Sequence, residues 1–140
     1  KDKAVLTLMN MDSIVETDFL TVRPNMDLGE MVKIISKSFR NQFPVVDVGG
    51  ELIGMVVLDD IRNIIFRQEL YHRFHVEGFM KVPKTRIVNT DSMEEVMEKF
   101  DTTGAWNLPV VDREGKYIGM VSKSKMLNTY RQVMVDFSEE

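Results

Sequence analysis

Apolar residues recur at the spacing of a buried helix face in two parts of the chain. One stripe follows Asp27 and the other follows Ser92, and both residue types can accept the free N–H groups that begin a helix. The apolar positions are Leu28, Met31, Val32, Ile35 and Phe39 in the first stripe and Met93, Val96, Met97 and Phe100 in the second. The pattern predicts two amphipathic helices, each with one face on a core.

Each predicted helix is followed by two short β-branched runs with a turn between them. The first runs are "FPVVDV" and "LPVVD", with Pro44 and Pro109 expected at the strand starts. The return runs are "ELIGMVV" and "KYIGMVS". Gly54 and Gly119 lie inside these return strands, where a glycine often marks the close approach of another backbone or a ligand. The pattern therefore predicts a β-hairpin after each helix.

These elements form one unit that occurs twice, with position 43 of the first copy aligned to position 108 of the second. Residues 43–65 and 108–130 share ten identities, namely the pairs 44/109, 45/110, 46/111, 47/112, 50/115, 53/118, 54/119, 55/120, 56/121 and 63/128. A short extended segment precedes each first helix ("LTVRP" and "RIVNT"), and a second helix follows each hairpin ("LDDIRNIIFRQEL" and "KSKMLNTYRQVM"). The unit reads β-α-β-β-α, and its first two strands are expected to be parallel through a right-handed crossover.

The predicted fold class is therefore α+β, with two β-α-β-β-α repeats related by pseudo-two-fold symmetry. We expect residues 1–72 to hold an N-terminal segment and the first repeat, and residues 73–140 to hold the second. The linker is expected near residues 67–78. Because the chain begins "KDK" without an initiator Met, we also expect that it is a piece of a larger protein.

Composition excludes several classes of function. The net charge of −4 argues against a nucleic-acid binder that depends on phosphate contacts. The chain has no cysteine, and no apolar run approaches the roughly 20 residues of a membrane helix. His72 and His75 are close together in the sequence, but no third ligand accompanies them, so no metal site is predicted. Signatures of hydrolases, P-loop enzymes and zinc proteases are missing, so we expect no catalysis.

The doubled phrase "PVVD-x-x-G-x-h-I-G-M-V" (h, hydrophobic), with "T-V-x-P" in the first copy, resembles a tandem pair of cystathionine-β-synthase (CBS) domains, a Bateman module. The resemblance covers roughly residues 14 to 130. The phrases "RNQFPVVD", "DSMEEVMEKF" and "GAWNLPVVD" further resemble the cytoplasmic C-terminal CBS pair of bacterial CLC-type chloride channels and transporters.

The resemblance implies a regulatory, non-catalytic module that binds ATP, ADP or AMP and forms a homodimer through CBS–CBS contacts. Its other partner would be the membrane-embedded channel portion of the parent chain, at the cytoplasmic face of the inner membrane. The fragment itself would neither insert into the membrane nor bind nucleic acid. The apolar residues of the second helices are the expected dimer contacts: Ile61, Ile64, Ile65, Met126, Tyr130 and Val133.

In this family the return strand often ends G-h-h-[ST]-x-x-D, and the final Asp holds the ribose hydroxyls of an adenosine nucleotide. A carboxylate suits this role because it can accept two hydrogen bonds from a vicinal diol. The first copy has Asp60 at this position, but Val57 replaces the hydroxyl residue. The second copy keeps the hydroxyl at Ser122, but Lys125 replaces the Asp. Neither copy carries the whole motif, and Lys125 cannot accept a bond from ribose.

The ligand cleft is expected between the repeats, with the residues before one copy's "PVVD" near the other copy's motif. On this interpretation Asp60 faces Ala105, Trp106 and Asn107, and Trp106 stacks on a purine. In the opposite cleft Lys125 meets Arg40 and Asn41, where two cations favour an anionic ligand or an acidic partner. The predicted ligand-contacting residues are Arg40, Asn41, Pro44, Val57, Asp60, Ala105, Trp106, Asn107, Pro109, Ser122 and Lys125.

Structural explanations exist for the same residues. Asp60 would also be expected as an acid in the first turn of a helix, where it interacts favourably with the helix dipole. Trp106 could be a core or interface aromatic. Ser122 could cap a helix, and Lys125 could be a solvated side chain. Two further functions therefore stay open. One is a structural dimerisation module with no ligand. The other is the CBS pair of another host, such as a magnesium transporter or a nucleotide-metabolism enzyme.

Overall fold

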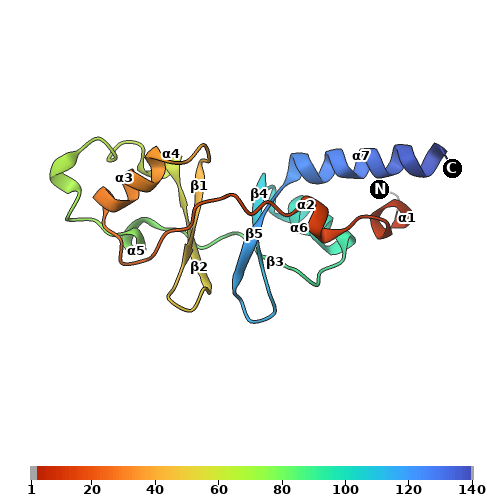
Figure 1. Ribbon diagram of the computed structural model, residues 1–140, viewed down its shortest axis with the longest axis horizontal. Coiled ribbons are helices and arrows are strands. Elements are labelled where there is room, and N and C mark those ends of the chain that lie inside the picture. Colours follow the sequence, from red (N-terminus) through yellow and green to blue (C-terminus); the bar gives the residue numbers. More distant parts are fainter. Residues whose placement is uncertain (1–2, 140) are drawn as a thin grey trace. The chain divides into compact units, whose positions relative to one another are not determined.

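The computed structural model describes residues 3–139, which form two compact units (Figure 1). The first-repeat unit comprises residues 18–83 together with the turn at 114–117. The second-repeat unit comprises the described residues up to Thr17, residues 84–113 and the described residues from Ile118 onward. Residues 3–17, which we expected to accompany the first repeat, thus pack with the second.

The first-repeat unit contains the predicted helix and hairpin. Helix α3 (Leu28–Ser36) precedes strands β1 (Gln42–Val46) and β2 (Leu52–Val57), which pair antiparallel from Gln42↔Val57 to Val46↔Leu52. The expected leading strand is reduced to one parallel bridge between Val22 and Val45. Three short elements complete the unit: α4 (Leu58–Ile61), η1 (Gln68–Leu70) and α5 (Val76–Phe79).

The second-repeat unit follows the same order. Strand β3 (Ile87–Val88) pairs parallel with β4 (Asn107–Val111), as predicted, and β5 (Tyr117–Ser122) lies on the other side of β4. Helix α6 (Met93–Thr103) connects β3 to β4, and α7 (Lys123–Glu139) follows β5. Two short N-terminal helices, α1 (Lys3–Thr7) and α2 (Met11–Ile14), complete the unit.

Both predicted helix starts are confirmed as capping boxes. The Asp27 carboxylate accepts the N–H of Glu30, and the Glu30 carboxylate accepts the N–H of Asp27; Ser92 and Glu95 repeat the arrangement at α6. The backbone N–H of Glu30, followed by the nearby ring of His72, holds the pKa of Asp27 below its ordinary value. Each helix therefore begins at the residue that its sequence indicates.

The predicted apolar stripes form the centres of two cores, with one exception. Met93, Val96, Met97 and Phe100 are all buried in the second-repeat unit, and Leu28 and Met31 are buried in the first. Phe39 is fully exposed, which contradicts its assignment to the first stripe. Helix α3 already ends at Ser36, so the helical spacing no longer directs Phe39 to the core.

The second helix of the first repeat is much shorter than predicted. Only Leu58–Ile61 is α-helical, and tighter turns follow, including hydrogen bonds from the N–H of Ile64 to Ile61 O and from that of Arg67 to Ile64 O. The expected linker is also packed, because Leu70 and Val76 are buried in the first-repeat core. Among residues 3–139, no helix has both the length and the apolar composition needed to cross a membrane.

The six expected dimer contacts lie in the cores of their own units or pack against them. Ile61 and Ile65 are buried and Ile64 is partly buried in the first-repeat core. Met126 is fully buried, and Tyr130 and Val133 pack against the same second-repeat core. Ile61, Ile65 and Met126 are therefore covered by their own unit, whereas the partly buried Ile64, Tyr130 and Val133 keep some exposed surface, and their role as dimer contacts stays a prediction.

Pro44 lies inside β1 rather than at its start. The carbonyl of Pro44 accepts the N–H of Val22, and the Val22 carbonyl accepts the N–H of Val46. A backbone N–H at position 44 would point to the edge of β1 that faces Val22. The single bridge on that edge does not use an N–H at position 44, so the proline is tolerated there. Pro109 likewise lies inside β4 rather than at its start.

Candidate functional site

Each unit has one point at which the return strand ends and a helix begins, and the family motif ends there. We call residues 57–60 the first step and residues 122–125 the second step. The first step joins β2 to α4, and the second joins β5 to α7. The two steps carry different side chains at every position, so each is described separately.

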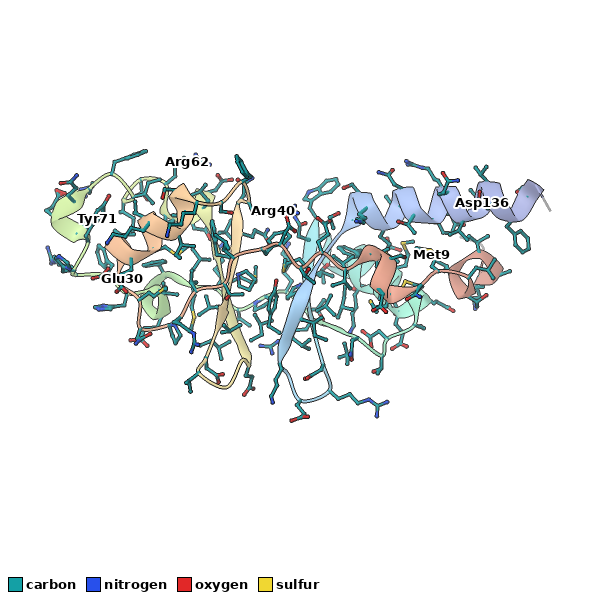
Figure 2. All side chains as sticks on the ribbon, viewed as in Figure 1. Met9, Glu30, Arg40, Arg62, Tyr71 and Asp136 are labelled. Carbon is teal, nitrogen blue, oxygen red and sulfur yellow. The ribbon has the colours of Figure 1, made fainter. Side chains whose placement is uncertain are left out.

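The carboxylate of Asp60 at the first step forms an ion pair with Lys81. Oδ2 of Asp60 lies 2.8 Å from Nζ of Lys81, and the side chains are 33% and 59% exposed. Val57, at the hydroxyl position of the motif, precedes α4 without any side-chain cap. Asp59 pairs with Arg62 at 2.6 Å (Arg62 is labelled in Figure 2). Asp60 is therefore a partly exposed acceptor with one cationic neighbour.

The backbone of Lys81 is fixed against β2. Its N–H donates to Met55 O and its carbonyl accepts the N–H of Met55, both at 2.8 Å. The second-repeat unit repeats this arrangement at the equivalent positions, where Glu16 and Met120 exchange hydrogen bonds of 2.7 and 2.9 Å. The sequence analysis did not identify Lys81 as a site residue. The one signal for it in the sequence is that the repeat aligns Lys81 with Glu16.

The two glycines of the return strands mark a close approach of backbone, as predicted. A Cβ on Gly119 would lie 2.6 Å from the carbonyl oxygen of Glu16. A Cβ on Gly54 would lie 2.7 Å from Sδ of Met80 and 3.2 Å from the carbonyl oxygen of Lys81. A side chain at Gly119 would push away the backbone of Glu16, whereas a side chain at Gly54 would first meet the flexible side chain of Met80.

Arg40 and Asn41 lie in the first-repeat unit with partners of their own. The carbonyl of Asn41 accepts the N–H of Leu58 at 2.9 Å, directly at the first step. The Nη2 group of Arg40 (Figure 2) donates to both carboxylate oxygens of Asp18 at 2.8 Å, and its guanidinium lies 4.2 Å from the ring centroid of Phe19. To bind an anionic ligand as predicted, Arg40 would therefore have to leave Asp18 or contact Asp18 and the ligand together.

The second step is rich in cations and lacks the motif carboxylate. Oγ of Ser122 accepts the N–H of Lys125 at 3.1 Å, so Ser122 caps α7. Lys123 donates its N–H to Trp106 O at 2.8 Å, and its Nζ lies 5.4 Å from the centroid of the Trp106 ring. Trp106 is 72% exposed, which contradicts the alternative of a core aromatic.

The structure thus places the residues before each "PVVD" beside the step of their own copy. Asn41 lies at the first step and Trp106 at the second. Ala105 and Asn107 flank Trp106 in the second-repeat unit, while Pro44 and Pro109 are buried within their strands. The pairing of Asp60 with Trp106, and of Lys125 with Arg40, stays a prediction.

The described residues offer hydrogen-bond acceptors and cations but no metal centre. Within residues 3–139, no group of three or more histidine, aspartate or glutamate side chains is arranged to hold a metal ion. His72, considered above as a ligand, instead lies 3.1 Å from Asp27, the cap of α3. The first step can accept hydrogen bonds from a diol through Asp60, and Lys81 beside it can bind an anion.

Comparison with known proteins agrees with the doubled motif. The sequence model of the CBS domain matches residues 11–67 and again residues 76–131. A CBS domain-containing protein of Dictyostelium discoideum is 25% identical over 131 residues, which are 86% of this chain and 90% of that protein. Some other curated relatives are much longer: an inosine-5'-monophosphate dehydrogenase of Aquifex aeolicus is 30% identical over 106 residues, which are 74% of this chain but only 21% of the dehydrogenase.

Solved structures share the fold at low sequence identity. CBSX2 in complex with AMP has a TM-score of 0.71 at 21% identity, with 89% of this chain and 96% of that chain covered. The CBS domain of the bacterial CNNM/CorC family Mg²⁺ transporter in complex with ATP has a TM-score of 0.76 at 12% identity, with 91% of each chain covered. The predicted α+β fold class is confirmed. Because two copies of the family motif match and the fold agrees, this chain belongs to the CBS domain family, as a tandem CBS pair.

Proposed function

We propose that this chain is a non-catalytic regulatory module that binds one adenosine nucleotide at the first step. The observation that carries the proposal is Asp60, a partly exposed carboxylate in the first turn of α4, at the motif position that holds ribose in the family. Fold relatives in complex with AMP and with ATP support an adenosine nucleotide as the ligand. ATP, ADP and AMP are all candidates.

Asp60 would supply the specific contact, because its two oxygens can accept bonds from the two ribose hydroxyls. The half-buried Val57 would contact the sugar or base through its methyl groups, since it has no hydroxyl to offer. Trp106 has an exposed ring, so it can stack on a base. The second step would not bind ribose in this way, because Lys125 only donates hydrogen bonds.

Regulation would follow from a shift of population. A nucleotide that prefers one relative placement of the two units, or of two copies of the chain, would bias the protein to which the module is attached. The proposed host is a CLC-type chloride channel or transporter, with the module on the cytoplasmic face of the inner membrane and assembled as a homodimer. The phrases around "RNQFPVVD" and "GAWNLPVVD" support this host.

The second candidate is a structural dimerisation module without a ligand. Two observations favour it: Lys125 replaces the second Asp, and Lys81 already neutralises Asp60. Other hosts within the family are a membrane transporter of a different ion or an enzyme of nucleotide metabolism. The reading frame upstream of Lys1 separates them, since membrane helices there would support the channel host and a catalytic domain would refute it.

Thermal unfolding with ATP, ADP, AMP and adenosine, with and without Mg²⁺, tests the nucleotide site. A ligand at one hundred times its dissociation constant stabilises the folded chain by about 2.7 kcal/mol. We expect a higher midpoint for the natural chain and for the control Lys125→Ala, and no shift for Asp60→Ala. No shift with any of these ligands at millimolar concentration would refute nucleotide binding and favour the dimerisation module. A nucleotide-induced rise of the midpoint that persists in Asp60→Ala would show that the nucleotide binds at another site, without Asp60.

A further inference from the structure

We infer that Lys81 makes the first step selective for phosphorylated adenosine ligands over the free nucleoside. The inference rests on the proposed nucleotide site and adds a residue that the family motif does not contain. Lys81 lies well beyond Asp60 in the sequence, yet its ammonium is 2.8 Å from the carboxylate. The physical question is what happens to this ion pair when a ligand arrives.

A ribose that binds Asp60 must compete with Lys81 for the carboxylate. The ammonium lies at Oδ2, and only one third of the Asp60 side chain is exposed. A free nucleoside brings hydroxyls for the carboxylate but no anion for the displaced ammonium. A nucleotide brings both, because its phosphate gives Lys81 a new charged partner. The pair therefore opposes binding of the nucleoside more than binding of the nucleotide.

Lys81 is better suited to this exchange than the neighbouring arginines. Its side chain is 59% exposed and flexible, whereas its backbone is fixed by two hydrogen bonds to Met55. Arg40 is held by both oxygens of Asp18, and Arg62 lies 2.6 Å from Asp59. An ammonium on a flexible side chain and a fixed backbone can leave Asp60 for a phosphate without a change of fold.

The second-repeat unit carries the opposite charges at the equivalent positions. The alignment that pairs the two hairpins also pairs Glu16 with Lys81 and Lys125 with Asp60. Glu16 bonds to β5 through Met120 as Lys81 bonds to β2 through Met55. A nucleotide placed there in the same way would meet a carboxylate with its phosphate and an ammonium with its ribose. Selection for a phosphate is therefore specific to the first step.

Calorimetric titration of AMP and of adenosine into the natural chain and into Lys81→Met tests the inference. The natural chain should prefer AMP by at least about tenfold, or about 1.4 kcal/mol. Lys81→Met should lose most of this ratio, mainly through weaker AMP binding, with adenosine binding unchanged or up to about threefold tighter because exposed ion pairs are weak. Lys81→Arg should keep the preference, since it keeps the charge. Lys84→Met serves as the control for removal of a lysine three residues further along the chain.

The variants should fold, because the hydrogen bonds that hold residue 81 are made by its backbone. An AMP-to-adenosine ratio that is the same in the natural chain and in Lys81→Met would overturn the role of Lys81 while leaving the nucleotide site intact. If Asp60→Ala binds neither AMP nor adenosine, this result supports the nucleotide site independently of the role of Lys81. If neither ligand binds the natural chain or Lys81→Met, the proposed function and this inference both fall.

Discussion

Replacing Gly119 by alanine should destabilise the second-repeat unit, because the new methyl group would meet fixed backbone. Its Cβ would lie 2.6 Å from the carbonyl oxygen of Glu16 and 2.7 Å from Cγ1 of Val15. The Glu16 carbonyl accepts the N–H of Met120 at 2.9 Å, and the N–H of Glu16 donates to Met120 O at 2.7 Å. Relief of the clash therefore requires these hydrogen bonds to lengthen or the strand to bend.

Gly54 provides the matched control, since it occupies the same position in the first repeat. A Cβ there would lie 2.7 Å from Sδ and 3.1 Å from Cγ of Met80, whereas the carbonyl of Lys81 is 3.2 Å away. The closest atoms belong to a flexible thioether side chain, which can change rotamer and move aside. Gly54→Ala should therefore be tolerated much better than Gly119→Ala.

The two costs can be compared directly. Overpacking costs about 1–3 kcal/mol, and Gly119→Ala belongs near the upper end because backbone must move. Alanine also reduces the conformational freedom of the unfolded chain, which returns about 0.4–1 kcal/mol in both variants. We expect a net loss of about 2 kcal/mol for Gly119→Ala and a change close to zero for Gly54→Ala.

Urea unfolding followed by circular dichroism and by fluorescence measures both variants. The single tryptophan, Trp106, lies in the second-repeat unit, so its fluorescence reports on the unit that Gly119→Ala perturbs. The midpoint should fall clearly for Gly119→Ala and hardly for Gly54→Ala. An equal loss in both variants, or a larger loss for Gly54→Ala, would refute the argument that backbone and side-chain neighbours differ in cost.

Three further predictions concern Asp27, two phenylalanines and Trp106. Folding lowers the pKa of Asp27 below 3.8, so the carboxylate stabilises the fold above that pH, and this stabilisation is lost as the pH falls through the lower folded pKa. Between pH 6 and pH 2 the urea midpoint should therefore fall more steeply for the natural chain than for Asp27→Asn. Phe39→Ser should change the free energy of unfolding by less than about 0.5 kcal/mol, whereas Phe100→Ala should cost about 3–5 kcal/mol in the same urea assay; similar costs would contradict the assigned burial. Trp106 should emit like a solvated indole and be quenched by iodide, and a blue-shifted, protected emission would contradict its 72% exposure.

The parts of the fold that depend on neighbouring residues in the sequence could be predicted. Asp27 and Ser92 indicated two helix starts because the cap and its Glu partner lie within one turn. Gly54 and Gly119 indicated a close approach because a glycine in a buried strand needs such a reason. These signals are local, so one sequence contains them in full.

The parts that depend on distant residues could not be predicted. No local signal indicates that Lys81 reaches Asp60, since their contact depends on the segment that pairs with β2. Phe39 was assigned to a core because the apolar spacing continues beyond Ser36, where the helix itself ends. Ile61 and Met126 were recognisable as buried, but the pattern could not tell burial inside one unit from burial between two copies.

Equilibrium dialysis with radiolabelled AMP would show whether the first step is the one nucleotide site of the chain, because it counts bound ligands. We expect one AMP per chain for the natural protein, one for Lys125→Ala and none for Asp60→Ala, since only the first step carries the motif carboxylate. Two molecules per chain would show that the second step binds nucleotide despite Lys125. No bound AMP, with ATP and ADP equally absent in the same assay, would contradict a nucleotide site in this chain.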